Sequence, residues 1–208
     1  TLNNVNAKGG YKFSNETNEI KSYFPENAGV QTVKMQINEN LDFSWWKNPK
    51  LEIKNNGTVL SSISAKSQAG ILKNNTIIYN EAYAGISEEF EVLSRGLENN
   101  TIIHSLNNQI SNSPEGTILE FSQIIELKSG WSIISNGKKM MQNFETDKFS
   151  ITIPGVEDQL HFSPIVVFDN KISKEEALFL TNSPKEKLTA NDLKKLEDLV
   201  YQSNYTAE

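Results

Sequence analysis

The chain has 208 residues, a formal net charge of −6 and no cysteine. An acidic chain without a cluster of lysine and arginine argues against nucleic acid and anionic membrane surfaces as partners. With no cysteine, the fold cannot depend on disulfides. No apolar run approaches the roughly 20 residues of a membrane-spanning helix, so we expect no membrane span. Because the first residue is Thr1 rather than Met, we expect a mature form or a fragment of a longer chain.

Most of the chain alternates apolar and polar residues with a period of two, which is typical of half-buried β-strands. In an early run, for example, Val33, Met35 and Ile37 alternate with polar residues. Further runs follow at intervals of about 8–12 residues, with turn residues between them. They are LDFSWW, TVLSSI, NTIIY, FEVLS, NTIIH, TILEFSQIIEL, WSIIS, KFSITI and HFSPIVVF. This spacing predicts an all-β sandwich or barrel.

Turn residues mark the strand ends in the last third of the chain. Asn136-Gly137 predicts a hairpin with a type I′ turn, because both central residues of that turn need positive φ. A later short strand is expected to end at Pro154-Gly155. The last apolar run contains Pro164, which we expect at an edge position or a bulge because proline cannot donate to a ladder.

Two short helices are predicted after the last strand. Ser173 precedes Glu176 by three residues, and Thr189 precedes Asp192 by three, so each helix begins with a capping box. The second helix carries an apolar stripe, which consists of Leu193, Leu196, Leu199 and Val200. A helix this short must bury its stripe, either on its own sandwich or on another subunit or domain. We therefore interpret residues 184–208 as a helical tail or junction and not as a further strand.

The order of these C-terminal elements resembles laminin-G-like domains of the concanavalin A-like lectin superfamily. In that family a strand ends in Asn-Gly-Lys, a short strand ends at Gly, and the last strand leads into a helix with paired glutamates. The matching residues are Asn136, Gly137, Lys138, Gly155, 168–173, Glu175 and Glu176. Earlier matches are Ser44, Trp45, Trp46, Pro49 and 55–64. The resemblance implies a two-sheet antiparallel jelly-roll sandwich over residues 1–183, followed by the helical tail.

A second resemblance, over residues 46–86, is to the jelly roll of lipopolysaccharide-transport proteins. It leaves the helix capped by Ser173 unexplained, so it ranks second. The first resemblance implies a non-catalytic glycan-recognition module of a secreted, cell-surface or virion protein, such as a phage tail component. The alternative is a structural or assembly β-domain without a sugar site, which forms homo-oligomers or joins a neighbouring domain. Fold alone does not decide between them.

We expect no enzymatic activity. The sequence has no P-loop, no Gly-x-Gly-x-x-Gly and no His-Glu-x-x-His motif. Glycosidases need two carboxylates held about 5–10 Å apart across a cleft. The nearest candidates are Glu89 with Glu91 and Glu120 with Glu126, which we interpret as solvated strand positions.

Aromatic residues are the candidate sugar-binding groups, since an exposed ring offers a flat apolar face and nearby polar side chains can bind hydroxyls. The candidates are Trp45, Trp46, Tyr79, Asn80, Glu81 and Tyr83. The last four are expected in a loop. Neighbouring residues of a strand point to opposite faces, so one of the two tryptophans is expected in the core and the other either between the ends of the sheets or exposed.

Calcium is the only cofactor that the resemblance leaves open, because lectin-like sandwiches often bind Ca²⁺ through carboxylates and carbonyl oxygens. Asp147, Glu157 and Asp158 flank the strand SITIPG and are the candidate ligands. His104 and His161 are isolated from other ligand types, so no zinc site is predicted.

Overall fold

The computed structural model describes residues 2–4, 10–38, 41–105, 112–141, 144–156, 160–203 and 205–207. The chain is 52% strand and 12% helix, which confirms the all-β class. It divides into two compact units, Thr1–Glu126 and Leu127–Glu208. The predicted boundary after residue 183 falls inside the second of these units. Within the described ranges, no helix has the length and apolar content to cross a membrane.

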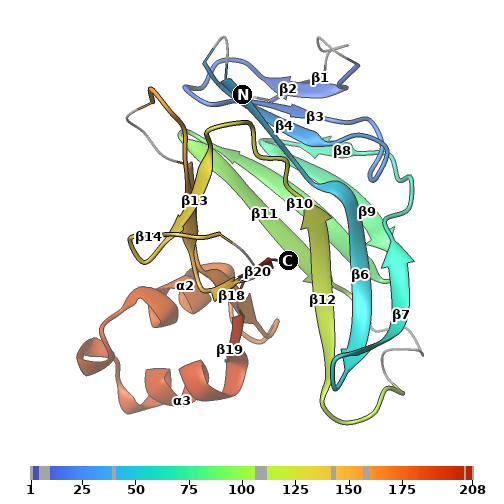
Figure 1. The fold of residues 1–208 in the computed structure, drawn as a ribbon. Coiled ribbons are helices and arrows are strands. Elements are labelled where there is room, and N and C mark those ends of the chain that lie inside the picture. Colours follow the sequence, from blue (N-terminus) through green and yellow to red (C-terminus); the bar gives the residue numbers. More distant parts are fainter. Residues whose placement is uncertain are drawn as a thin grey trace. The chain divides into compact units, whose positions relative to one another are not determined.

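The first unit consists of three antiparallel sheets (Figure 1). One sheet contains five strands in chain order: β1 (Asn3–Asn4), β2 (Phe13–Asn15), β3 (Lys21–Phe24), β4 (Val33–Asn38) and β5 (Leu41–Trp45). The second has the order β12-β6-β7, with β6 (Lys47–Asn55), β7 (Thr58–Ser64) and β12 (Thr117–Ile124). The third has the order β11-β10-β9-β8, with β8 (Ile71–Lys73), β9 (Thr76–Tyr83), β10 (Ile86–Leu93) and β11 (Gly96–Ile103).

An aromatic cluster around Phe90 forms the core of this unit. The centroid of the Phe90 ring lies 5.0 Å from that of Trp46, 5.9 Å from Phe24 and 6.0 Å from Tyr79. Phe24 belongs to the five-stranded sheet, whereas Tyr79 and Phe90 belong to the four-stranded sheet. The two sheets therefore pack against each other through aromatic side chains. Such ring pairs each contribute about 0.5–1.5 kcal/mol beyond the burial of their area.

The second unit combines short strands with two helices. One sheet has the order β14-β13-β16-β17, with β13 (Ser132–Ser135), β14 (Lys138–Lys139), β16 (Phe149–Thr152) and β17 (Leu160–Phe162). Two strand pairs complete it: β15 (Phe144–Thr146) with β20 (Tyr205–Ala207), and β18 (Ile165–Phe168) with β19 (Val200–Ser203). The helices are α2 (Lys174–Asn182) and α3 (Ala190–Leu199), separated by the 3-10 turn η1 (Lys185–Lys187).

Local geometry confirms one expectation about this unit and corrects another. Asn136 and Gly137 have φ values of 49° and 73° and join β13 to β14, which confirms the hairpin. Pro164 lies between β17 and β18 rather than at a bulge. The run that the sequence predicted as one strand is therefore two strands, and each pairs with a different partner.

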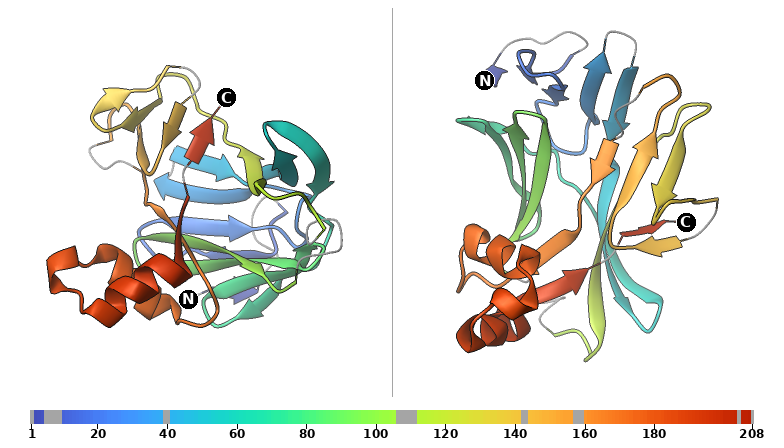
Figure 2. Two further views of the ribbon diagram at one scale, coloured as in Figure 1. Left: turned by 90° about the horizontal axis from the view of Figure 1, so that it is seen from below. Right: turned by 90° about the vertical axis from the view of Figure 1, so that its left-hand side faces the viewer.

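The C-terminal residues are more than a helical tail. After α3 the chain returns as β19 and β20, so the prediction that residues 184–208 contain no strand is wrong. The two helices lie side by side next to β18 and β19 (Figures 1 and 2). The apolar stripe of α3 and Val166 pack on a buried cluster formed by Ile172, Ala177, Leu180 and Leu188. The stripe is therefore partly buried within its own unit.

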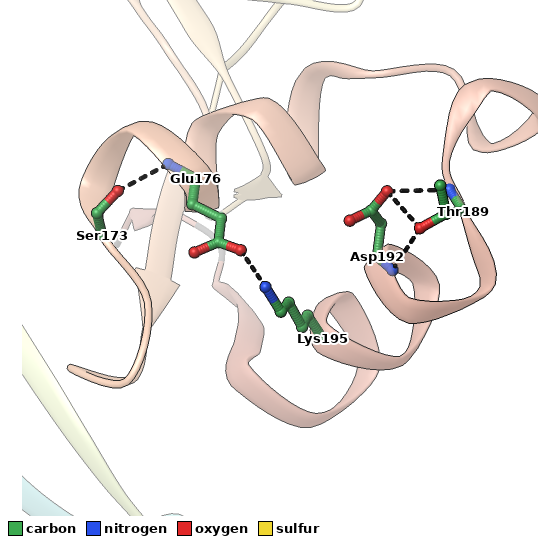
Figure 3. A network of polar contacts seen from close by, with 5 residues as sticks. All are labelled: Ser173, Glu176, Thr189, Asp192 and Lys195. Atoms are coloured by element: carbon green, nitrogen blue, oxygen red, sulfur yellow. Dashed lines mark hydrogen bonds and ion pairs between the residues drawn. The ribbon is translucent and has the colours of Figure 1, made fainter.

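Both helix starts have the predicted N-cap residue, but only α3 has the predicted reciprocal capping box (Figure 3). The Ser173 Oγ accepts a hydrogen bond from the Glu176 N–H at 3.1 Å. At α3 the box is reciprocal: the Thr189 Oγ1 accepts from the Asp192 N–H, and the Asp192 carboxylate accepts from the Thr189 N–H. The Glu176 carboxylate does not close a box of its own and instead pairs with Lys195, which links the two helices.

Candidate functional site

The four aromatic rings predicted to bind sugars are part of the core. Trp46 is 4% exposed, and Trp45, Tyr79 and Tyr83 are also buried. Tyr79 and Tyr83 lie in β9 and not in a loop. The prediction of an exposed aromatic platform is therefore wrong.

The backbone at Trp46 explains why both tryptophans are buried. Trp45 ends β5, and Trp46 links it to β6 with a φ of 57°. Side chains alternate between faces only while the backbone stays extended, so this residue breaks the alternation. Both rings then pack on Phe90, with centroid distances of 6.3 Å for Trp45 and 5.0 Å for Trp46. Positive φ is unusual for a bulky residue, so the sequence pattern did not predict it.

The two tyrosines have structural contacts. The Tyr79 hydroxyl donates a hydrogen bond to the Pro25 carbonyl oxygen at 2.7 Å, and burial raises the pKa of Tyr79. Burial, and secondarily the charge of Glu88, also raises the pKa of Tyr83. The Tyr83 ring contacts Phe121 at a centroid distance of 5.9 Å. Both residues connect β9 to other parts of the first unit.

The polar members of the predicted sugar site lie on the surface of β9. Asn80 and Glu81 are exposed. Glu81 has a φ of 49°, and its N–H donates to the Ser87 Oγ at 3.1 Å. The Ser87 Oγ also shares a hydrogen bond of 2.9 Å with the His104 Nε2. The Ser–His pair lies at the β-bulge between β9 and β10 and stabilises it. Because Ser87 is buried, its hydroxyl is not an accessible nucleophile.

The predicted calcium ligands are only partly described. Asp147 is exposed, whereas Glu157 and Asp158 lie outside the described residues. In the part of the chain that is described, no three His, Cys, Asp or Glu side chains gather where they could hold a metal ion. His161 shares a hydrogen bond of 2.8 Å with the Ser150 Oγ through its Nδ1. The calcium site stays a prediction.

The group with the most unusual chemistry is Glu88, which the sequence analysis missed. This residue of β10 is 3% exposed. Its carboxylate accepts hydrogen bonds from the Asn99 Nδ2 at 2.8 Å and the Thr101 Oγ1 at 2.9 Å, both on β11. Desolvation raises the pKa of Glu88 to about 7, although the two hydrogen bonds act in the opposite direction. The period of two could have identified it, because it shares a strand face with Phe90 and Val92.

Glu88 can exchange a proton near neutral pH, which is a property that general acids and bases also have. Its hydrogen-bond partners are an amide and a hydroxyl, and both come from a neighbouring strand. It lies among core residues, cross-strand from Tyr79. The arrangement is that of a buried acid that links β10 to β11 in a pH-dependent way.

Charged residues form a ladder on the three-stranded sheet. The Glu52 carboxylate lies 2.6 Å from the Lys50 Nζ and 3.3 Å from the Lys54 Nζ. Lys54 also pairs with Glu120 at 2.6 Å. The hydrogen bond from Lys50, followed by that from Lys54, holds the pKa of Glu52 below its usual value. Glu126 pairs with Lys47.

Apolar side chains remain exposed on the outer strands of two sheets of the first unit. They are Val59 and Leu60 on β7, Ile71 on β8, Ile103 on β11, and Ile118, Phe121 and Ile124 on β12. All four strands are at the edge of their sheet. Natural proteins usually protect such edges with charge, proline or a covering segment, because an open edge pairs readily with another chain.

Comparisons with known proteins found no family model, curated protein or solved structure that matches this chain. The laminin-G-like relationship therefore stays a prediction.

Proposed function

We propose that the chain is a non-catalytic structural or assembly module that joins protein chains through the edges of its sheets. The observation that carries this proposal is the set of exposed apolar side chains on the edge strands β7, β8, β11 and β12. Strand addition to an open edge supplies backbone hydrogen bonds, and apolar side chains on alternate positions supply specificity. This favours the assembly alternative over glycan recognition.

The burial of the aromatic candidates is the reason for this preference. Stacking on a sugar ring needs an exposed aromatic face, and Trp46, Tyr79 and Tyr83 contribute theirs to the core. In this proposal the first unit is a sandwich, supported by the aromatic core that its two sheets share. The proposal includes two further predictions. One is a jelly-roll order of strands, and the other is an extracellular, cell-surface or virion location.

Two measurements on the full chain test the proposed function. The first is the mass in solution over a range of concentrations, which we expect to exceed the 23.4 kDa of a single chain at high concentration. The second is a glycan array with and without Ca²⁺, which we expect to show no specific ligand. A monomer that binds one class of glycan specifically contradicts the proposal and restores glycan recognition.

A further inference from the structure

We propose that β12 pairs in an antiparallel manner with β12 of a second copy of this chain, with Phe121 opposite Phe121 at the two-fold axis. The inference rests on the proposed assembly function and names its partner and its surface. Three observations support it: the open and regular edge of β12, the exposure of its apolar residues, and the symmetric spacing of those residues.

The outer edge of β12 is available for a further strand. Within the described part of the first unit, β12 pairs with β6 and with no other strand. Its one irregularity lies between Ser122, which faces Lys50, and Ile124, which faces Lys47. The extra residue is therefore on β6, where Asn48 has a φ of 48°. β12 itself stays extended, so its outer backbone groups keep the regular alternation that a partner strand needs.

The exposed apolar residues of β12 are placed symmetrically about Phe121. Ile118 is 56% exposed, Phe121 39% and Ile124 48%. Ile118 and Ile124 are each three residues from Phe121. In an antiparallel pair centred on Phe121, Ile118 of one copy faces Ile124 of the other, and the phenylalanines face each other. Each exposed apolar side chain then has an apolar cross-strand partner, which is the contact that stabilises sheets.

Charge selects the same register. With Phe121 at the centre, Glu120 of one copy faces Ser122 of the other. A register centred one residue earlier places the two Glu120 carboxylates directly opposite each other, which is destabilising. A register centred one residue later places Glu120 opposite Ile124 and removes the apolar pairs. A surface that complements itself in this way fits a two-fold interface between identical chains.

Cysteine cross-linking tests the register directly, because the chain has no cysteine of its own. Under mild oxidation, Phe121→Cys is expected to form a disulfide-linked dimer, since facing residues of an antiparallel pair lie within disulfide reach. Val30→Cys is the matched control, an exposed apolar position in the turn between β3 and β4 and outside the four edge strands, and is expected to stay reduced. Neither Ile118→Cys nor Ile124→Cys alone should cross-link, but a mixture of the two should.

A charge at the interface tests its contribution to affinity. Ile118→Lys places a charge opposite Ile124 of the other copy and removes an apolar pair at each end of the dimer, so it is expected to weaken self-association at least about tenfold. Val30→Lys, outside the four edge strands, should leave it unchanged. Both side chains are exposed, so unchanged thermal unfolding of each variant in dilute solution shows that the fold is intact.

The outcomes separate the two proposals. If the chain self-associates but the β12 cysteines cross-link no faster than Val30→Cys, the β12 interface is wrong and the assembly function remains. If the chain is monomeric at all concentrations, β12 pairing is wrong. A monomer that also binds a specific glycan contradicts the assembly function as well.

Discussion

Among single residues, Glu88 couples the stability of the first unit to pH. Burial raises its pKa from 4.5 to about 7 in the folded chain. The folded state then binds the proton more tightly than the unfolded state, so stability is full below about pH 4.5 and falls as the pH rises to about 7. The loss amounts to roughly 3 kcal/mol, since one pKa unit corresponds to about 1.4 kcal/mol.

Glu88→Gln should remove this dependence. We expect the variant to melt at a higher temperature than the wild type at about pH 8 and at a similar temperature at about pH 4. Thermal unfolding across this range measures the effect. Glu89→Gln is the control, because the neighbouring side chain lies on the other face of β10 and should leave the pH profile unchanged. Parallel profiles for the wild type and Glu88→Gln contradict this account of Glu88.

The core position of Trp46 gives a second prediction at this scale. Trp46→Ala removes a buried ring that packs on Phe90 and Tyr79 and should cost about 3–5 kcal/mol in the free energy of unfolding. Asn80→Ala, at an exposed position of the predicted sugar site, should change it by less than about 0.5 kcal/mol. Denaturant unfolding measures both. A small effect of Trp46→Ala shows that the ring is not part of the core.

At the scale of elements, the caps of the two helices differ in their expected contributions. Thr189→Ala removes the hydroxyl of a reciprocal capping box and should destabilise the second unit by about 1 kcal/mol. Lys194→Ala, at an exposed position of the same helix, should have an effect below about 0.5 kcal/mol. Chemical denaturation followed by helix circular dichroism tests the pair. Equal effects contradict a capping role for Thr189.

Local chemistry decides which elements the sequence predicts. The Asn136-Gly137 hairpin and the caps at Ser173 and Thr189 depend on a few adjacent residues, and all three are found. The strand β19 depends on pairing with β18, more than thirty residues earlier in the chain. Its first residue, Val200, also continues the apolar stripe of α3, so the same side chain fits a helix and a strand.

The candidate site was less predictable than the turns and caps, because its burial depends on residues that are distant in the sequence. Period-two reasoning places one of two adjacent tryptophans outside the core, and a single left-handed residue, Trp46, overturns it. Glu88 is buried because of the strand face on which it lies and because other residues cover that face. Only the strand face can be predicted from the neighbouring residues in the sequence. Residue type alone identified rings that could bind a sugar, but not whether their faces were free.

At the scale of the whole chain, the division into units follows packing and not the type of element. The sequence predicted a boundary at residue 183, where strands give way to helices. In the structure residue 183 lies inside the unit Leu127–Glu208, and residues on both sides of it share a buried cluster, from Ile172 in the loop after β18 to Leu188. Strands occur on both sides of Glu126, so no change in periodicity marks the end of the first unit.

Hydrogen exchange of the full chain at increasing concentration tests the central claim, that the molecule assembles through the open edge of β12. Amides at this edge lack a partner strand in the first unit and should exchange faster than those of β6, which is paired on both sides. We predict that protection of residues 117–124 rises with protein concentration, while that of residues 160–162, in the edge strand β17 of the second unit, does not change. Protection of residues 117–124 that is independent of concentration contradicts the claim.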